Sequence, residues 1–128
     1  MLNFVVFKKM FAKGCGAVPN IFKNFKKLKD DFYEIEEDLI FMKDARLARI
    51  KSCGQVSAEG FWYEQPEDEW VMVLDGEGEL EWQDGRKKLL RAGDYLFLPA
   101  FEKHRVCYTS QQPPCIWLAI YGKIEEKK

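Results

Sequence analysis

The sequence predicts an all-β domain, a small barrel or sandwich preceded by a short helical segment. Residues 47–121 consist of short apolar runs separated by turn residues, which is typical of such folds. Leu80 and Trp82 alternate with polar neighbours, as expected of a strand with one face toward a core and the other toward water. At 128 residues the chain has room for one hydrophobic core, so we expect a single domain.

The N-terminal part is distinguished by its charge. Residues 1–29 contain seven lysines and no acidic residue. Glycines and Pro19 interrupt the segment, which predicts a loosely ordered basic extension, either a solvated arm or a surface for an anionic partner. Within residues 20–39, apolar residues recur at approximately helical spacing and Asn20 can act as an N-cap, so one short helix is predicted there.

The rest of the chain is predicted to form strands. The Asp84-Gly85 dipeptide is a strong hairpin signal, because a type I′ turn needs positive φ at both central positions. The predicted strands are residues 47–52, 60–64, 69–74, 79–83, 86–90, 94–98, 104–109 and 115–121. The domain plan is therefore an extension at 1–19, a helical or edge lead-in at 20–46, a barrel at 47–122 and a charged tail at 123–128.

Composition excludes several classes of protein. The chain has 20 Lys and Arg against 21 Asp and Glu, a net charge of -1, which argues against nucleic acid or an anionic membrane as the main partner. No apolar run approaches the roughly 20 residues of a membrane span. The apolar run at residues 2–7 is closed by Lys8 and Lys9 and is short for a signal peptide, so no secretion signal is expected.

The four cysteines contain no Cys-x-x-Cys pair and are too sparse for a disulfide scaffold. We therefore expect reduced thiols and a cytoplasmic protein. A hairpin turning near Gln111 would place Cys107 and Cys115 roughly opposite one another, as neighbouring thiols or as a disulfide.

Two stretches of the barrel carry spaced motifs. In the first, Glu69 is followed seven positions later by Gly76. In the second, Gly93, Pro99 and His104 are spaced as glycine, five residues, proline, four residues and histidine. These stretches resemble the two motifs of the cupin superfamily. Their amino-acid sequence resembles that of small single-domain bacterial cupins without an assigned activity. The resemblance covers roughly residues 47–121 and implies the cupin double-stranded β-helix, a small jelly roll.

The chain departs from the cupin pattern at the metal site that the resemblance implies, three histidines and one glutamate. Glu69 and His104, the single histidine, are retained. Tyr63 and Gln65 occupy the positions of the other two histidines if the spacing to the glutamate is three residues, whereas Trp62 and Glu64 occupy them if it is four. In an extended strand only one of these pairs can face the barrel interior. A second departure is Phe101, which replaces the second glycine of the later motif.

The leading functional hypothesis is a barrel pocket formed by Tyr63, Gln65, Glu69 and His104, with Glu64 as a further ligand-binding candidate. Such a pocket would bind a divalent metal weakly or a small polar molecule directly, with no assignable activity. Glu69, His104 and Gln65 are the candidate metal ligands, and their mixed oxygen and nitrogen donors would suit manganese, iron, zinc or nickel.

The alternative is a metal-dependent oxygenase, isomerase or decarboxylase in which Tyr63 and His104 are the catalytic candidates. A third possibility is a vestigial pocket, with the basic arm contacting a partner. Each residue also has a structural interpretation: His104 as a hydrogen-bonded residue at a strand start, Glu69 as the ion-pair partner of Arg105, and Tyr63 as an interior aromatic. A homodimer is expected, because a jelly roll this small exposes strand edges.

Overall fold

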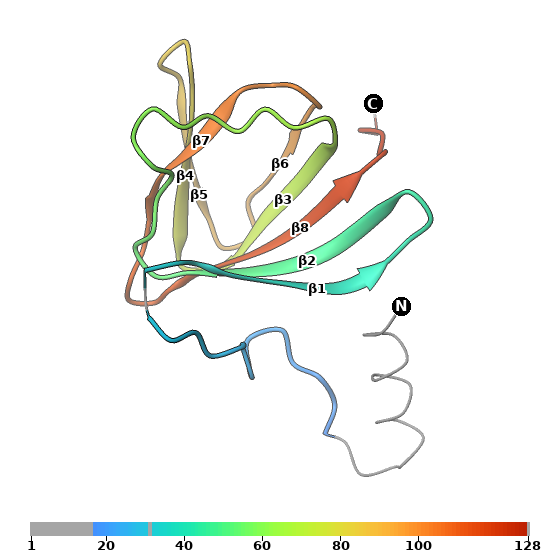
Figure 1. The fold of residues 1–128 in the computed structure, drawn as a ribbon, viewed down its shortest axis with the longest axis vertical. Coiled ribbons are helices and arrows are strands. Elements are labelled where there is room, and N and C mark those ends of the chain that lie inside the picture. Colours follow the sequence, from blue (N-terminus) through green and yellow to red (C-terminus); the bar gives the residue numbers. More distant parts are fainter. Residues whose placement is uncertain (1–16, 31, 128) are drawn as a thin grey trace.

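The structure, a computed structural model, describes residues 17–30 and 32–127. Within these residues two antiparallel sheets face one another and no helix is present, which confirms the all-β jelly roll (Figure 1). The strands are β1 (Ile35–Phe41), β2 (Ala45–Ser52), β3 (Asp68–Asp75), β4 (Glu77–Trp82), β5 (Lys87–Arg91), β6 (Tyr95–Leu98), β7 (His104–Thr109) and β8 (Cys115–Gly122). In this part of the chain there is no helix that could cross a membrane.

The larger sheet has the order β1-β2-β8-β3-β6, and the smaller has the order β5-β4-β7. Consecutive strands β3 and β4 lie in different sheets, as do β7 and β8, so the chain passes between the layers as a jelly roll requires. β8 is central: Ser52 of β2 is paired with its Cys115, and Glu69 of β3 with its Tyr121.

The core lies between the two sheets and follows the alternation of the strands. Val71 and Val73 point inward from β3, and Leu80 and Trp82 point inward from β4, as the sequence predicts. Gly78 of β4 leaves the space that the Trp117 ring occupies, because a Cβ at this glycine would overlap the ring atoms. The glycine thereby lets a large aromatic side chain cross the barrel interior.

The predicted helix within residues 20–39 is wrong. Residues 17–30 form turns and extended chain, and β1 begins at Ile35. The physical reason is the buried Arg49 of β2, whose guanidinium donates hydrogen bonds to backbone carbonyls that a helix would use internally. Those carbonyls belong to Asn20, Ile21, Lys23 and Asn24, at 2.8–3.3 Å.

Two further predictions of local structure are corrected. Residues 60–64 do not form a strand; only Tyr63 pairs, in an isolated bridge with His104. The predicted hairpin of the last two strands does not form, because β8 is buried on both faces and takes the centre of the larger sheet while β7 pairs with β4. Cys107 and Cys115 therefore lie in different sheets, and both are free thiols.

Candidate functional site

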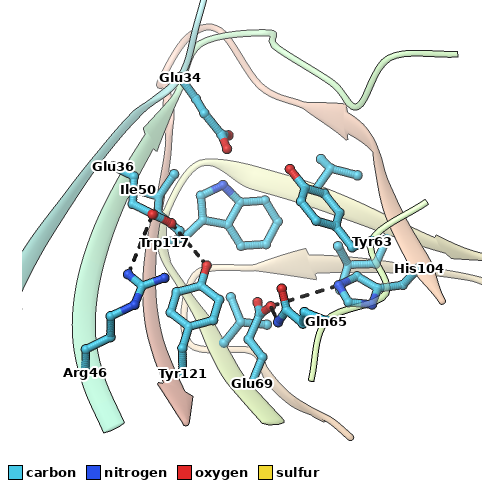
Figure 2. A pocket seen from close by; sticks show the side chains of 13 residues that line it. Glu34, Glu36, Arg46, Ile50, Tyr63, Gln65, Glu69, His104, Trp117 and Tyr121 are labelled. Atoms are coloured by element: carbon cyan, nitrogen blue, oxygen red, sulfur yellow. Dashed lines mark hydrogen bonds and ion pairs between the residues drawn. The ribbon is translucent and has the colours of Figure 1, made fainter. Parts of the chain in front are cut away.

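A cavity of about 320 Å³ opens into the barrel between the two sheets (Figure 2). It collects side chains from both layers and from the segment that precedes β3. The lining residues are Glu34, Glu36, Arg46, Ile50, Tyr63, Gln65, Glu69, Val71, Leu80, His104, Val106, Trp117 and Tyr121. The structure thus brings together Tyr63, Gln65, Glu69 and His104, the four residues predicted from the motifs.

Glu69 points into the cavity from the start of β3 and is 9% exposed. Its Oε1 accepts a hydrogen bond from the Gln65 amide at 3.2 Å and lies 4.0 Å from Nε2 of His104. Burial raises the pKa of this carboxyl to about 7. The predicted pairing with Arg105 is wrong, because that guanidinium lies beside Glu81, at 3.9 Å, and donates to the Ser57 carbonyl.

His104 is the first residue of β7, and its side chain is buried. Its Nδ1 lies 2.9 Å from the carbonyl oxygen of Glu102. Because a carbonyl only accepts, Nδ1 carries the proton and the Nε2 lone pair faces the cavity. Burial lowers the pKa of the imidazole, which keeps it neutral at physiological pH.

Tyr63 and Gln65 are held by backbone hydrogen bonds to two residues within the second motif. The amide of Tyr63 donates to the carbonyl of His104 at 2.7 Å, and the Tyr63 ring stacks on the imidazole at 5.7 Å between centroids. The amide of Phe101 donates to the Gln65 carbonyl at 2.8 Å. Burial raises the pKa of the Tyr63 phenol, so its hydroxyl stays protonated.

Glu64 lies outside the cavity. Its carboxylate pairs with Lys103 at 3.3 Å, and both side chains are about half exposed. The neighbouring Trp62 lies beside the Arg105 guanidinium, 5.8 Å from its ring centroid, and does not line the cavity. The spacing of three residues before Glu69 is therefore the one that faces inward.

Motif reasoning missed the acidic side of the cavity, which comes from the lead-in to β1 and from β1 itself. Figure 2 shows Glu34 and Glu36 across the cavity from His104. Glu34 accepts a hydrogen bond from the Ser52 hydroxyl at 2.8 Å, and that hydroxyl accepts one from the Trp117 indole at 3.2 Å. Both glutamates remain partly open to solvent, which places them at the mouth.

Arg46 is the basic residue of the lining, and its charge is paired with two carboxylates. It lies 2.6 Å from Asp38 and 3.6 Å from Glu36, with its guanidinium 4.3 Å from the centroid of the Tyr121 ring. The Tyr121 hydroxyl donates to Glu36 at 3.2 Å. The sequence did hold a signal for this cluster: acidic residues at 34, 36 and 38 alternate with period two, as the inward face of a strand would.

The donor set does not fit the metal centre of three histidines and one glutamate. Of the four positions, only Glu69 and His104 carry metal-binding side chains; Tyr63 and Gln65 present a phenol and an amide. In the described part of the chain, no group of three or more His, Cys, Asp or Glu side chains is arranged to hold a metal ion. No step is therefore assigned to a metal.

The arrangement can bind and can exchange protons. Gln65, Tyr63 and Tyr121 supply amide and hydroxyl groups, while Glu69 and His104 present an acid and a neutral base to the same space. Nucleophilic chemistry by thiols is disfavoured, because burial raises the pKa of Cys115 to about 12 and none of the cysteines that the structure describes lines the cavity.

Comparisons with known proteins agree with this architecture. The model of the cupin domain matches residues 54–121. No curated protein matches the chain. A solved structure from Ralstonia eutropha JMP134, described as a putative mannose-6-phosphate isomerase, is 36% identical, covers 85% of this chain and 100% of its own, and has a TM-score of 0.74.

Two more distant structures show the fold alone. KdgF from Halomonas sp. is 16% identical, with 84% of this chain and 94% of that chain covered and a TM-score of 0.64. A cupin superfamily protein from Desulfitobacterium hafniense DCB-2 is 18% identical, with 72% and 79% covered and a TM-score of 0.58.

Proposed function

Because the chain belongs to the cupin family, we propose that it is a small-molecule-binding cupin whose barrel pocket holds a small polar ligand directly. One observation carries this proposal: Tyr63, Gln65, Glu69 and His104 converge on one cavity of about 320 Å³ with apolar walls. A concave, partly apolar site with a few convergent polar groups is the usual form of a small-molecule site. No specific activity is assigned.

Direct binding is favoured over binding through a metal. A weakly held manganese, iron, zinc or nickel ion would have Glu69 and His104 as its ligands, with the Gln65 amide as a third. The alternative of a metal-dependent oxygenase, isomerase or decarboxylase depends on such an ion, and no observation beyond the shared cavity of these residues supports it. Activity of the relative from Ralstonia eutropha is not carried over, since a phosphate would need an unpaired basic side chain and Arg46 is paired.

The proposal is tested by a ligand-observed NMR screen of small polar metabolites against the parent and two matched variants. Val106→Phe adds a ring to the cavity lining, while Val56→Phe makes the same change at a half-exposed position away from it. We expect ligands that bind the parent and Val56→Phe and lose binding to Val106→Phe. Ligands that bind all three proteins equally, or a parent that binds none, would contradict the proposal.

Homodimerisation and a cytoplasmic location belong to the same proposal, together with the absence of nucleic-acid and membrane partners. The larger sheet ends in the edge strands β1 and β6, and exposed Tyr95 lies beside Trp70 on it, with ring centroids 5.6 Å apart. Light scattering after gel filtration tests the assembly: a mass near twice that of one chain is expected, and a monomer at all concentrations would contradict it.

A further inference from the structure

The charge of the pocket lining is strongly one-sided. Three carboxylates, those of Glu34, Glu36 and Glu69, face one arginine and a neutral imidazole. Arg46 is committed to Glu36 and Asp38. In the described residues no lysine or arginine forms an ion pair with Glu34 or Glu69, whose partners are a serine hydroxyl and an amide.

The nearby glutamates help to raise the pKa of two phenols in the cavity, those of Tyr63 and Tyr121. Burial is the main cause of the raised pKa of Tyr63, and Glu34, Glu69 and Glu36 raise it further. Burial likewise raises the pKa of Tyr121, with Glu69 and Glu36 adding to the effect. Two phenols from different parts of the chain therefore lie close to the same glutamates.

The walls of the cavity are aromatic as well as acidic. Trp117 and Tyr121 come from β8 and Tyr63 from the segment before β3, and the three side chains line one space (Figure 2). Tyr121 already holds a cation, the Arg46 guanidinium, over its ring. Among the described residues no cationic side chain lies over Tyr63 or Trp117. One face of the Tyr63 ring stacks on the His104 imidazole, but both rings line the cavity, where a cation supplied by a ligand can contact them.

We propose that the pocket selects a small organic cation, an amine or a quaternary ammonium, which Glu69 and the mouth glutamates attract and the rings of Tyr63 and Trp117 contact. This inference rests on the proposed function of the same cavity. A neutral ligand would strip water from Glu69 without compensating its charge, whereas a cation compensates it. An anionic ligand would meet three carboxylates and, among the described residues, no unpaired lysine or arginine in the lining, so the same charges disfavour phosphorylated sugars.

The test compares ligands of equal shape and different charge by calorimetric titration at pH 8. Choline is paired with its neutral carbon isostere 3,3-dimethylbutan-1-ol, and butylammonium with butan-1-ol. We expect each cation to bind about tenfold or more tightly than its neutral counterpart. Mannose and mannose 6-phosphate complete the panel, with the phosphate weakening binding.

Single substitutions show which carboxylate is responsible for the preference for a cation. Glu69→Gln should weaken choline binding by about fivefold or more and leave the neutral isostere nearly unchanged. Glu64→Gln makes the same change on the exposed residue next to Gln65, outside the cavity, and should change neither ligand. If Glu69→Gln does not fold, Glu36→Gln at the mouth serves in its place, with a smaller loss in the same direction.

Each outcome decides between the two proposals. Equal binding of choline and its isostere, or tighter binding of mannose 6-phosphate than of mannose, overturns cation selection. Neutral molecules that bind the parent and not Val106→Phe, while the cations fail to bind, also overturn it and leave the small-molecule pocket standing. Failure of the cations and of every metabolite in the NMR screen removes both.

Discussion

The Glu69 carboxyl and the His104 imidazole face one another across 4.0 Å inside the barrel, with Gln65 bridging to the same carboxyl oxygen. The pKa values of the two groups shift in opposite directions because each group loses water on burial. The pKa of the carboxyl is raised and that of the imidazole is lowered. Burial therefore favours the neutral form of each group, and the Glu69 carboxyl is mostly ionised only above a pH of about 7.

Glu69 makes the stability of the protein depend on pH. Its pKa is 4.5 when unfolded and about 7 when folded, so between these values the folded state binds more protons than the unfolded state. Stability contributed by this residue therefore falls as pH rises from 4.5 through 7, by up to about 3 kcal/mol. We expect Glu69→Gln to remove this dependence and to be more stable than the parent at pH 8.

Urea denaturation between pH 5 and pH 8 measures the effect as a difference between parent and variant. The difference is needed because His104, with its lowered pKa, contributes the opposite slope, losing stability as pH falls below its unfolded value. Glu64→Gln, an exposed residue in an ion pair, is the control and should follow the parent. Parallel curves for the parent and Glu69→Gln would show that the buried carboxyl does not titrate as stated.

Metal content should be well below one ion per chain in the parent and in Glu69→Ala and His104→Ala, measured by mass spectrometry on protein purified without chelator. The low metal content is expected because Tyr63 and Gln65 stand at two of the four ligand positions. Substituting histidine at both positions restores the ligand set. Tyr63→His with Gln65→His recreates three histidines and Glu69 on the inward face, so this double variant should bind nickel or zinc at about one ion per chain.

The matched control places the same two histidines on the opposite face, as Trp62→His with Glu64→His. Their side chains lie outside the cavity, so that variant should gain no comparable site. A stoichiometric metal in the parent, or equal metal uptake by the two double variants, would contradict this account of the site.

Several strands of the barrel could be predicted because they depend on local pattern. Alternation at Leu80 and Trp82 and the Asp84-Gly85 hairpin signal identify β4 and β5, although only Gly85 of the two has a positive φ, so the turn is not of the predicted type I′. The motif left two spacings before Glu69 open, and the structure is what places Tyr63 and Gln65 in the pocket.

The lead-in and the acidic side of the pocket could not be predicted in the same way. β1 turns Glu36 toward the cavity and Ile35 away from it, which inverts the usual order of apolar inside and polar outside. The helical spacing of residues 20–39 was overridden by Arg49, a contact across more than 20 positions of chain. Likewise, β8 joins the larger sheet through pairing with β2, which no local pattern near Cys115 records.

Phe101 adopts the left-handed conformation that glycine favours. It has φ of 64° at the position where the second motif has its second glycine, and its side chain is 62% exposed. Replacing it with glycine relieves a strain of about 1 kcal/mol and adds unfolded-chain entropy of a similar or smaller size. We expect Phe101→Gly to match or exceed the parent in stability by up to about 1 kcal/mol.

Phe101→Val provides the contrast, because a β-branched residue tolerates positive φ poorly and should lose about 1 kcal/mol or more relative to the parent. The comparison uses the free energy of unfolding in urea. Loss of exposed aromatic surface is common to both variants, so it cannot produce a difference between them. Glycine destabilising the protein as much as valine does would show that the left-handed turn carries no strain.

Arg49 holds the segment at residues 20–24 against the outer face of β2. Its guanidinium donates to four backbone carbonyls, pairs with Glu37 at 3.2 Å and stacks on the Phe25 ring at 4.0 Å. Methionine keeps the length and loses every one of these hydrogen bonds. We therefore expect Arg49→Met to lose about 2 kcal/mol or more of unfolding free energy, since four backbone carbonyls and Glu37 lose their donor.

Lys51→Met is the matched control, because Lys51 lies on the same strand face and contacts the same Phe25 ring, at 5.5 Å, and forms no ion pair with the described residues. It should change stability by less than about 0.5 kcal/mol. Arg49→Lys should fall between the two, since an ammonium cannot present the planar fork that reaches several carbonyls at once.

Limited trypsin digestion gives a local readout: cleavage at Lys23, Lys26, Lys27 and Lys29 should accelerate in Arg49→Met under conditions where the barrel stays folded. Unchanged cleavage together with unchanged stability would mean that the segment is held by its apolar contacts rather than by the guanidinium.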